Sequence, residues 1–201
     1  MNQAGFAPPI AGPRRWDVLA GFMAEQKYKT FVEVGCKEGR TTGHILKAIP
    51  DSQVIAIDPW IVQAPSADAT RETYEKWDFA KIEADFWKNV GENKDRCTML
   101  QMTSAEVRKN IPLKDGFDLV FIDALHDYDS VYEDIRLWWP KVRVGGMLCG
   151  HDFNHQWPGV ERAVADSFNL MQVGVTSDSV WFVLKQHEDQ LRASTPVTEA
   201  A

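Results

Sequence analysis

The chain has 201 residues, of which 44% are hydrophobic and 25% are charged, and these values are typical of a single globular domain. No apolar run reaches the roughly 18 residues that cross a bilayer, and the N-terminus lacks the apolar stretch of a secretory signal, so we expect a cytoplasmic protein without membrane contact. The net charge of −7 disfavours nucleic acid as a partner, because phosphate backbones are bound by clustered lysine and arginine.

Helical and strand patterns alternate from residue 14 to residue 185. Amphipathic stretches predict helices at 14–27, 40–48, 70–90, 104–110, 129–139 and 158–168. Short β-branched or aromatic runs predict strands at 30–34, 53–57, 97–101, 117–122, 145–149, 171–175 and 180–185. The last two strands are too close together for a parallel crossover. We therefore expect an α/β fold with a seven-stranded, mostly parallel sheet that ends in an antiparallel hairpin.

Three segments depart from this alternation. Residues 1–12 are rich in proline and glycine and predict a flexible N-terminus, whereas the polar residues 186–201 predict a disordered tail. Residues 61–95 are longer than a minimal crossover, and their Ala/Pro/Ser-rich start followed by an aromatic helix suggests a lid over a substrate pocket. The alternative is a solvent-facing helix whose aromatic side chains are core or homodimer contacts. The catalytic domain would then span residues 13–185.

The loop after the first strand, FVEVGCKEGRTT, has the features of a ligand-binding turn. Gly35 and Gly39 let the backbone pass close to a ligand, and the following helix offers free N–H groups. The loop lacks the G-x-G-x-x-G pattern of dinucleotide-binding folds and the G-K-[ST] ending of a P-loop. Glu33 would repel phosphate and suits a cationic ligand instead.

The second strand ends at Asp58 in the sequence VIAIDPW. Asp58 follows Glu33 at the distance typical of an acid that hydrogen-bonds ribose hydroxyls, although capping a turn is the alternative role. Pro59 stiffens the turn. Trp60 is placed either to stack on an adenine or to pack in the core.

Several motifs in this order resemble class I S-adenosylmethionine-dependent methyltransferases over residues 14–185. They are the acid-x-G-x-x-x-G loop, the aspartate that ends strand two, FDLVFIDA in strand four, a GG turn into strand five and the closing hairpin. FVEVGCKEGRTT, AIDPW and the GHDF after strand five are similar to bacterial small-molecule O-methyltransferases. The resemblance implies a Rossmann-like three-layer sandwich, S-adenosylmethionine as cofactor and a small-molecule acceptor.

The resemblance also implies roles for individual cofactor residues. Glu33, Gly35 and Gly39 would surround the methionine and ribose part of the cofactor, and Asp58, with Pro59 and Trp60 beside it, would hold the ribose. Ser104 falls where such enzymes contact adenine, although an N-cap of the next helix is the alternative.

The family order implies that strands four and five are neighbours, which would bring Asp123, His126, His151 and Asp152 to one rim beside the cofactor's methyl group. Asp123 would then contact both cofactor and acceptor. A hydroxyl acceptor must lose its proton, and His126 or His151 is suited as the base. Alternative helix- or turn-capping roles remain for Asp127, Asp129, Asp152 and Asn154.

A divalent metal is the second way to activate a hydroxyl group, and here the implied ligands are Asp123, His151 and Asp152. Metal-dependent relatives have two carboxylates or an Asp-Asn pair after strand five, whereas this chain has His-Asp. The histidine weakens the case for Mg²⁺ and suits Mn²⁺, Fe²⁺ or Zn²⁺.

The predicted function is methyl transfer to a small-molecule hydroxyl group. Two alternatives are a non-catalytic cofactor-binding domain of the same fold and an NAD-linked oxidoreductase. A binding domain would not need the cluster of acidic and imidazole side chains after strands four and five. An NAD-linked oxidoreductase is disfavoured because the chain lacks the G-x-G-x-x-G pattern.

Overall fold

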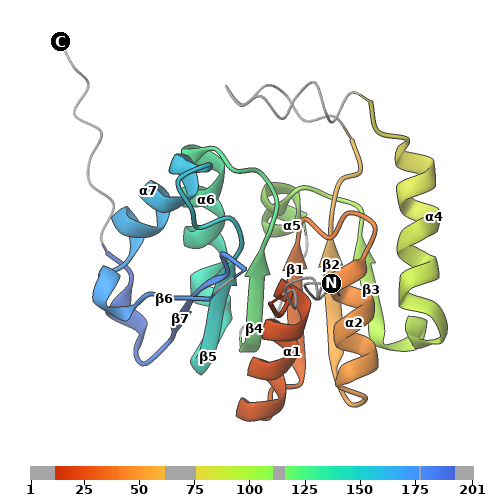
Figure 1. The fold of residues 1–201 in the computed structure, drawn as a ribbon, viewed down its shortest axis with the longest axis horizontal. Helices are drawn as coiled ribbons and strands as arrows, with labels where there is room; N and C mark the ends of the chain where they lie inside the picture. The colour runs from red at the N-terminus through yellow and green to blue at the C-terminus, as the bar shows by residue number, and fades with distance from the viewer. Residues whose placement is uncertain (1–11, 62–75, 111–115, 177, 193–201) are drawn as a thin grey trace, which may run out of the picture.

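The computed structural model describes residues 12–61, 76–110, 116–176 and 178–192 (Figure 1). Its centre is one sheet of seven strands in the order β3-β2-β1-β4-β5-β7-β6. The strands are β1 Thr30–Val34, β2 Gln53–Ile57, β3 Cys97–Leu100, β4 Phe117–Ile122, β5 Val142–Gly150, β6 Gly174–Val175 and β7 Trp181–Leu184. The first five are parallel, and β7 runs antiparallel to both β5 and β6. This arrangement confirms the predicted sheet and its closing hairpin.

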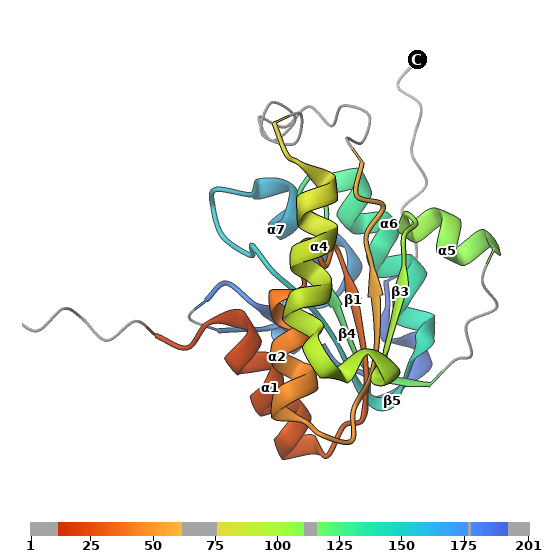
Figure 2. The ribbon, with the colours of Figure 1, turned by 90° about the vertical axis from the view of Figure 1, so that its right-hand side faces the viewer.

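Helices cover both faces of the sheet and make it the middle of three layers. They are α1 Arg15–Gln26, α2 Arg40–Ala48, α4 Phe79–Val90, α5 Ser104–Asn110, α6 Tyr128–Trp138 and α7 Pro158–Ser167. Figure 2 shows α1 and α2 on one side of the sheet and α5 and α6 on the other. The predicted Rossmann-like sandwich is confirmed.

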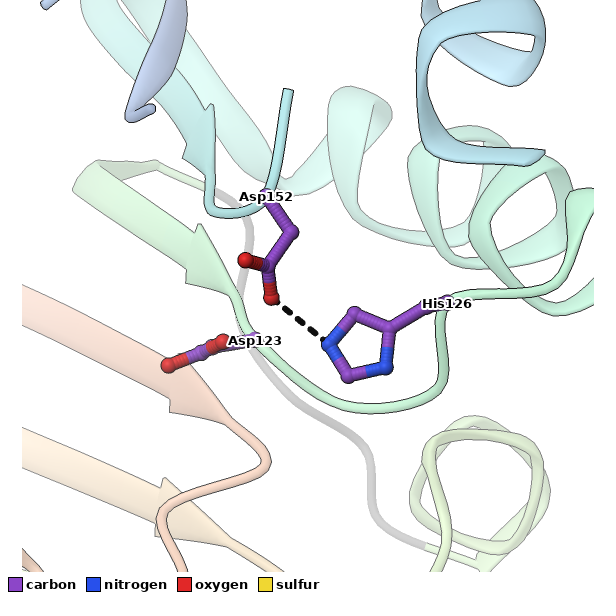
Figure 3. Close-up of side chains that lie close together, drawn as sticks. All are labelled: Asp123, His126 and Asp152. Atoms are coloured by element: carbon purple, nitrogen blue, oxygen red, sulfur yellow. Dashed lines mark ion pairs between the residues drawn. The ribbon is translucent and has the colours of Figure 1, made fainter. Parts of the chain in front are cut away.

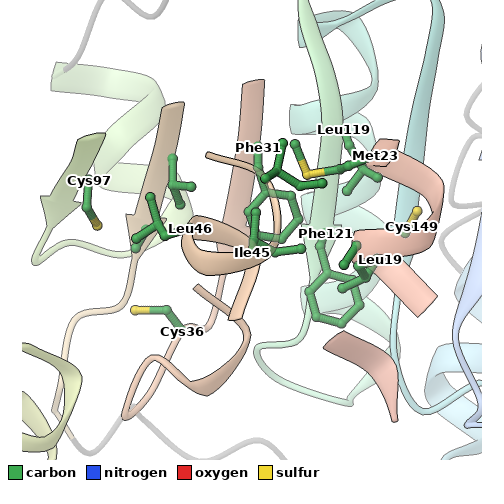
Figure 4. Packing of buried hydrophobic residues seen from close by; sticks show 14 of the residues in the cluster. Leu19, Met23, Phe31, Cys36, Ile45, Leu46, Cys97, Leu119, Phe121 and Cys149 are labelled. Atoms are coloured by element: carbon green, nitrogen blue, oxygen red, sulfur yellow. The ribbon is translucent and has the colours of Figure 1, made fainter. Parts of the chain in front are cut away.

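Alternation along the strands divides the core between the two faces, because successive side chains of a strand point to opposite sides. Phe31 and Leu119 pack with helices α1, α2 and α4 in a cluster that Figure 4 shows in part. Val32 and Val120, one residue further along, pack with helices α5, α6 and α7. Both clusters lie beneath the carboxyl edge of the sheet and hold its loops in place.

The helix predicted at 70–90 begins later than expected. In the described residues it starts at Phe79, and the Asp78 side chain caps it by accepting a hydrogen bond from the N–H of Lys81 at 3.0 Å. Residues 76–78 are not helical, and 62–75 lie outside the described residues. The lid therefore stays a prediction for most of its length. Within the described part, Phe86 is a fully buried core residue, whereas Trp77 and Phe79 line a cavity.

The fifth and sixth predicted strands, at 145–149 and 171–175, also change. β5 begins at Val142, because Gly145 and Gly146 form a bulge inside it and not a turn before it. Gly145 has a φ of +79°, and a Cβ on Gly146 would lie 2.7 Å from the carbonyl oxygen of Asp118. Residues Leu170–Gln172 form a 3₁₀ turn, so β6 is only two residues long.

Part of the predicted disordered tail is ordered. Gln190 is buried, and its side-chain amide donates to the carbonyl of Leu184 at 3.0 Å, while the N–H of Arg192 donates to Ser167. Residues 193–201 and the predicted flexible segment up to residue 11 lie outside the described residues. Among the described helices, none is long and apolar enough to cross a membrane.

Candidate functional site

A cavity of about 560 Å³ lies at the carboxyl edge of the sheet. The loops after β1, β2, β4 and β5 line it, together with the starts of α5 and α6 and with Arg15 from α1. This volume lies within the range of about 300–1,000 Å³ that small-molecule sites occupy. Its position is where open α/β sheets bind their ligands.

Main-chain hydrogen bonds continue the parallel pairing beyond the strand ends and place the loop residues. The N–H of Gly35 donates to Ile57 at 2.8 Å, and the N–H of Asp123 donates to Val34 at 2.8 Å. The N–H of His151 donates to the carbonyl of Ile122 at 3.0 Å. The loops after β1, β4 and β5 are therefore fixed side by side, as the implied strand order requires.

Gly35 and Gly39 are also needed for a reason that was not predicted, the close approach of other protein segments. Gly35 has a φ of +87°, and a Cβ there would lie 2.3 Å from the backbone oxygen of Asp123. Gly39 has a φ of +69°, and its Cβ would lie 2.5 Å from the ring of Phe86. Both glycines therefore allow protein segments to approach each other, and Gly35 lines the cavity as well.

Glu33 is a buried acid at the cavity wall. Only 2% of the residue is exposed, and the hydroxyl of Thr42 donates a hydrogen bond to its carboxyl group. Burial raises the pKa of Glu33 to about 8, and the hydrogen bond from Thr42 offsets only part of this effect. A cationic group in the cavity would favour the ionised carboxylate.

Asp58 caps the turn, which was the alternative role considered for it, and it also lines the cavity, where its contact with ribose stays a prediction. Its two carboxylate oxygens accept hydrogen bonds from the N–H groups of Lys37 at 2.8 Å and Trp60 at 2.9 Å. Burial raises its pKa, and these two bonds partly offset the rise. Pro59 also lines the cavity.

Trp60 does not face the cavity in the described structure. Its ring packs edge-on against Phe86 with centroids 5.5 Å apart, and its indole N–H donates to the carbonyl of Lys37 at 3.1 Å. Only 5% of the residue is exposed. The packing alternative therefore accounts for this residue, and the adenine-stacking role loses its support.

Ser104 lines the cavity but does not cap helix α5. Thr103 is the capping residue, because its hydroxyl accepts from the N–H of Glu106 at 3.2 Å and its own N–H donates to the Glu106 carboxylate at 2.8 Å. Next to Ser104, the buried carboxyl of Asp134 also lines the cavity, and burial raises its pKa to about 7. We missed Asp134 in the sequence, although an acid between Val131 and Ile135 on the apolar face of a helix is a recognisable signal.

The four residues expected after β4 and β5 lie together. Asp152 is central, because His126 Nε2 lies 2.8 Å from its Oδ2 (Figure 3). His151 Nδ1 lies 3.2 Å from the other oxygen, Oδ1. His151 Nδ1 is also 3.7 Å from Asp123 Oδ1. Asp152 has a φ of +60°, a rare conformation for a residue other than glycine, and such conformations cluster at functional sites.

The ion pairs shift the pKa values of this cluster in opposite directions. Burial alone would raise the pKa of Asp152, but the contacts with His126 and His151 hold it well below its usual range. Burial would lower the pKa of His151, but the hydrogen bond with Asp152 and the charge of Asp123 raise it overall. Asp123 keeps a raised pKa because burial outweighs its neighbours.

Trp157 supports the His126 ring from one side. The two rings are stacked with centroids 4.2 Å apart at an angle of 25°, and both line the cavity. His126 Nδ1 is buried and has no hydrogen-bond partner in the described part of the chain. Asp152 therefore holds the imidazole at Nε2, while Nδ1 is enclosed and makes no hydrogen bond among the described residues.

The remaining polar candidates have structural roles. Asp127 caps α6 by accepting a hydrogen bond from the N–H of Ser130 at 3.0 Å. Asn154 stabilises a turn by accepting from Gln156, so the capping role considered for Asp152 is not realised. Trp138 and Trp139, at the end of α6 and directly after it, are buried in the core.

Arg15 and Asp178 belong to the site and were missed in the sequence. Arg15 Nε lies 3.2 Å from Asp123 Oδ2, in a charge contact without the alignment of a hydrogen bond. Asp178 accepts a hydrogen bond from the main-chain N–H of Arg15 and lies 3.9 Å from His151 Nε2. Neither residue follows a parallel strand, so the pattern that revealed the others contained no signal for these two.

A possible metal-ligand set exists in the cluster but differs from the predicted one. Ligand atoms of Asp123, His126 and Asp152 all lie within 4.8 Å of one another, so His126 takes the place expected for His151. A mixed set of carboxylates and imidazole suits Mn²⁺, Fe²⁺ or Zn²⁺. The carboxylate oxygens of this set, however, already face nitrogen atoms of Arg15 and the two histidines.

Comparison with known proteins identifies the family. The methyltransferase domain family matches residues 32–153, a range that begins within β1 and ends just after β5. The chain belongs to this methyltransferase family. Together with the strand order, this match makes it a class I S-adenosylmethionine-dependent methyltransferase.

Solved structures of methyltransferases share the fold. Cofactor-bound Rv0187 from MTB is 16% identical with a TM-score of 0.62, and the match covers 90% of this chain and 84% of that one. The O-methyltransferase from Bacillus cereus in complex with SAH is 15% identical with a TM-score of 0.57, covering 89% and 84%. TomG, an O-methyltransferase from Streptomyces achromogenes in complex with SAM, is 12% identical with a TM-score of 0.58, covering 88% and 81%.

A more similar sequence has no assigned activity. The uncharacterized protein R132 of Acanthamoeba polyphaga mimivirus is 24% identical over 143 residues. The match covers 68% of this chain and 60% of the viral protein, so the chain spans less than two thirds of that relative.

Proposed function

We propose that this methyltransferase transfers a methyl group from S-adenosylmethionine to a hydroxyl oxygen of a small molecule. The observation that carries the proposal is the contact between His126 and Asp152, at 2.8 Å, in the same cavity as Glu33 and Asp58. The O-methyltransferases among the structures of similar fold agree with this acceptor class.

We divide the cavity into two halves. The cofactor half contains Glu33, Asp58, Ser104 and Asp134, and the acceptor half contains Arg15, Asp123, His126, His151 and Asp152. The cofactor half fits S-adenosylmethionine, since the buried carboxyl of Glu33, hydrogen-bonded by a neutral hydroxyl, suits its positive charges and Asp58 suits its ribose hydroxyls. When bound, the cofactor supplies a methyl group on an electrophilic sulfonium.

His126 would accept the proton of the acceptor hydroxyl as the oxygen attacks. Because Nε2 faces Asp152, the proton would go to Nδ1, which has no hydrogen-bond partner among the described residues and would have to be uncovered as the acceptor binds. The imidazolium formed is then stabilised by the Asp152 carboxylate. The carbon–sulfur bond breaks with its electron pair remaining on sulfur, so charge and atoms balance.

The aromatic side chains of the cavity suggest the shape of the acceptor. Trp157 and Trp77 both line it, and flat aromatic walls suit a phenol ring or the face of a sugar. We propose a hydroxylated ring as the acceptor class.

Turnover tests the proposal. The protein is incubated with S-adenosylmethionine and a panel of phenols and sugars, and S-adenosylhomocysteine and the methylated product are measured by mass spectrometry. We expect both products in equal amounts with at least one hydroxylated acceptor, and the methyl group on oxygen. Methylation only of nitrogen or carbon in a matched panel of amines and activated carbons would contradict the assignment.

A further inference from the structure

The acceptor half contains a positive charge supplied by the chain itself. Arg15, the first residue of α1, extends to Asp123 and places Nε 3.2 Å from Oδ2. The Asp123 side chain is 12% exposed and that of Arg15 is 33% exposed, so the contact is well shielded from water.

The position of Arg15 is fixed by its own backbone. Its N–H donates to the carboxylate of Asp178, which lies in the turn between β6 and β7. Helix α1 is also anchored by Leu19 and Met23, which are fully buried in the core. The backbone of Arg15 is therefore fixed at two points, the hydrogen bond to Asp178 and the buried face of α1, and the guanidinium extends from this fixed position to Asp123.

The two aspartates of the cluster each face nitrogen on both carboxylate oxygens. For Asp123 the neighbours are Arg15 Nε at 3.2 Å and His151 Nδ1 at 3.7 Å. For Asp152 they are His126 Nε2 at 2.8 Å and His151 Nδ1 at 3.2 Å. A divalent ion bound to Asp123 would lie beside the Arg15 guanidinium, which repels it, and would have to replace the contacts that Asp152 makes with the two histidines.

We infer that Arg15 is the resident cation of this centre and the counter-ion of Asp123, so that Asp123 and Asp152 bind no metal ion. It follows, if the proposed methyl transfer holds, that the reaction is independent of metal. The carboxylate and imidazole groups of the cluster match metal ligands in kind, but one oxygen of Asp123 already faces the Arg15 guanidinium.

The inference is tested by adding Mn²⁺ alone to the full chain. Electron paramagnetic resonance and calorimetry measure how much Mn²⁺ binds. We expect the wild-type protein to leave Mn²⁺ free. Arg15→Gln removes the charge and should bind Mn²⁺ at least about tenfold more tightly, because the like-charge repulsion at Asp123 is gone. Arg15→Lys keeps a cation and should behave as the wild type.

Arg40→Gln is the matched control, because Arg40 also lines the cavity but is 65% exposed and contacts Glu38 and not Asp123. It should leave Mn²⁺ binding unchanged. Equal tightening in Arg40→Gln and Arg15→Gln would overturn the specific role of Arg15. Tight Mn²⁺ binding by the wild type that is lost in Asp123→Asn would overturn the whole inference. This comparison does not need Arg15→Gln, so it decides the question even where that variant fails to fold.

The consequence for the reaction is tested separately. Formation of S-adenosylhomocysteine by the wild type should be unchanged after exhaustive treatment with a chelator and after addition of Mn²⁺ or Mg²⁺. Loss with the chelator and recovery with metal would contradict the inference. If no turnover occurs under any condition, the proposed function fails, while the Mn²⁺ titration still decides the role of Arg15.

Discussion

In the cofactor half of the cavity, Glu33 and Asp58 are held by neutral groups, a threonine hydroxyl and two main-chain N–H donors. In the acceptor half, Asp123 and Asp152 face a guanidinium and two imidazoles. The carboxyl groups of the cofactor half are therefore hydrogen-bonded by neutral donors, whereas those of the acceptor half face cationic or imidazole nitrogen atoms. Acids held by neutral donors leave a place for a positively charged ligand, whereas an acid beside an imidazole orients a base.

Gly35, in the loop after β1, contacts the backbone of Asp123 from the acceptor half. Gly35→Ala should therefore have the largest effect on stability. Its φ of +87° and the 2.3 Å approach of a Cβ to the Asp123 carbonyl predict a loss of about 3 kcal/mol or more in the free energy of unfolding. Chemical denaturation measures this loss.

Gly21→Ala is the control for this change. Gly21 lies inside α1 with nothing within 4 Å of its added Cβ, so the substitution should stabilise the protein by about 0.5–1 kcal/mol. Equal denaturation midpoints for Gly35→Ala and the wild type would contradict the close contact between the two halves.

His126→Asn should separate the two halves. Loss of the base should lower kcat by about 10² to 10⁴-fold with the acceptor found in the turnover panel, because general base catalysis contributes that much. The affinity for S-adenosylmethionine should stay the same. His44→Asn removes a histidine that pairs with Asp17 outside the cavity and should leave kcat unchanged. An unchanged kcat in His126→Asn would exclude it as the base.

Glu33 predicts a smaller, proton-linked effect. Its pKa of about 8 keeps the carboxyl group mostly protonated at pH 7 in the free protein, and a cationic ligand favours the ionised form. Binding of S-adenosylmethionine at pH 7 should therefore release a fraction of a proton. Calorimetry in two buffers of different ionisation enthalpy measures this release, and it should vanish in Glu33→Gln. Proton uptake by the wild type would contradict the assignment.

The same shift makes stability depend on pH. Because the pKa of Glu33 is raised in the folded state, its contribution to stability is complete below its ordinary pKa of 4.5 and is lost as the pH rises through about 8. Glu33→Gln should flatten this part of the stability profile.

The sequence predicted the first four strands well, because buried parallel strands are short apolar runs with clear ends. It failed at β5, where Gly145 and Gly146 form a bulge in place of the expected turn, and at α4, where Asp78 caps the helix late. Both errors have the same cause. A glycine pair can form either a turn or a bulge, and an acid in a polar segment can either cap a helix or lie within it.

The candidate site was predictable where residues follow parallel strands. Asp58, Asp123 and Asp152 line the cavity because strand ends share one edge of the sheet. Arg15 and Asp178 reach the site from α1 and from a turn, so only tertiary packing reveals them. Trp60 was ambiguous because stacking and packing use the same side chain.

Titration of the protein with S-adenosylmethionine tests the central claim most directly, since the two halves have meaning only if this cofactor binds. Calorimetry should show one site, weakened about ten- to hundredfold in Asp58→Asn through the loss of charged hydrogen bonds. Asp51→Asn, which removes an exposed ion pair with Lys29 before the start of β2, should bind as the wild type does. No binding of S-adenosylmethionine together with binding of NAD would contradict the account.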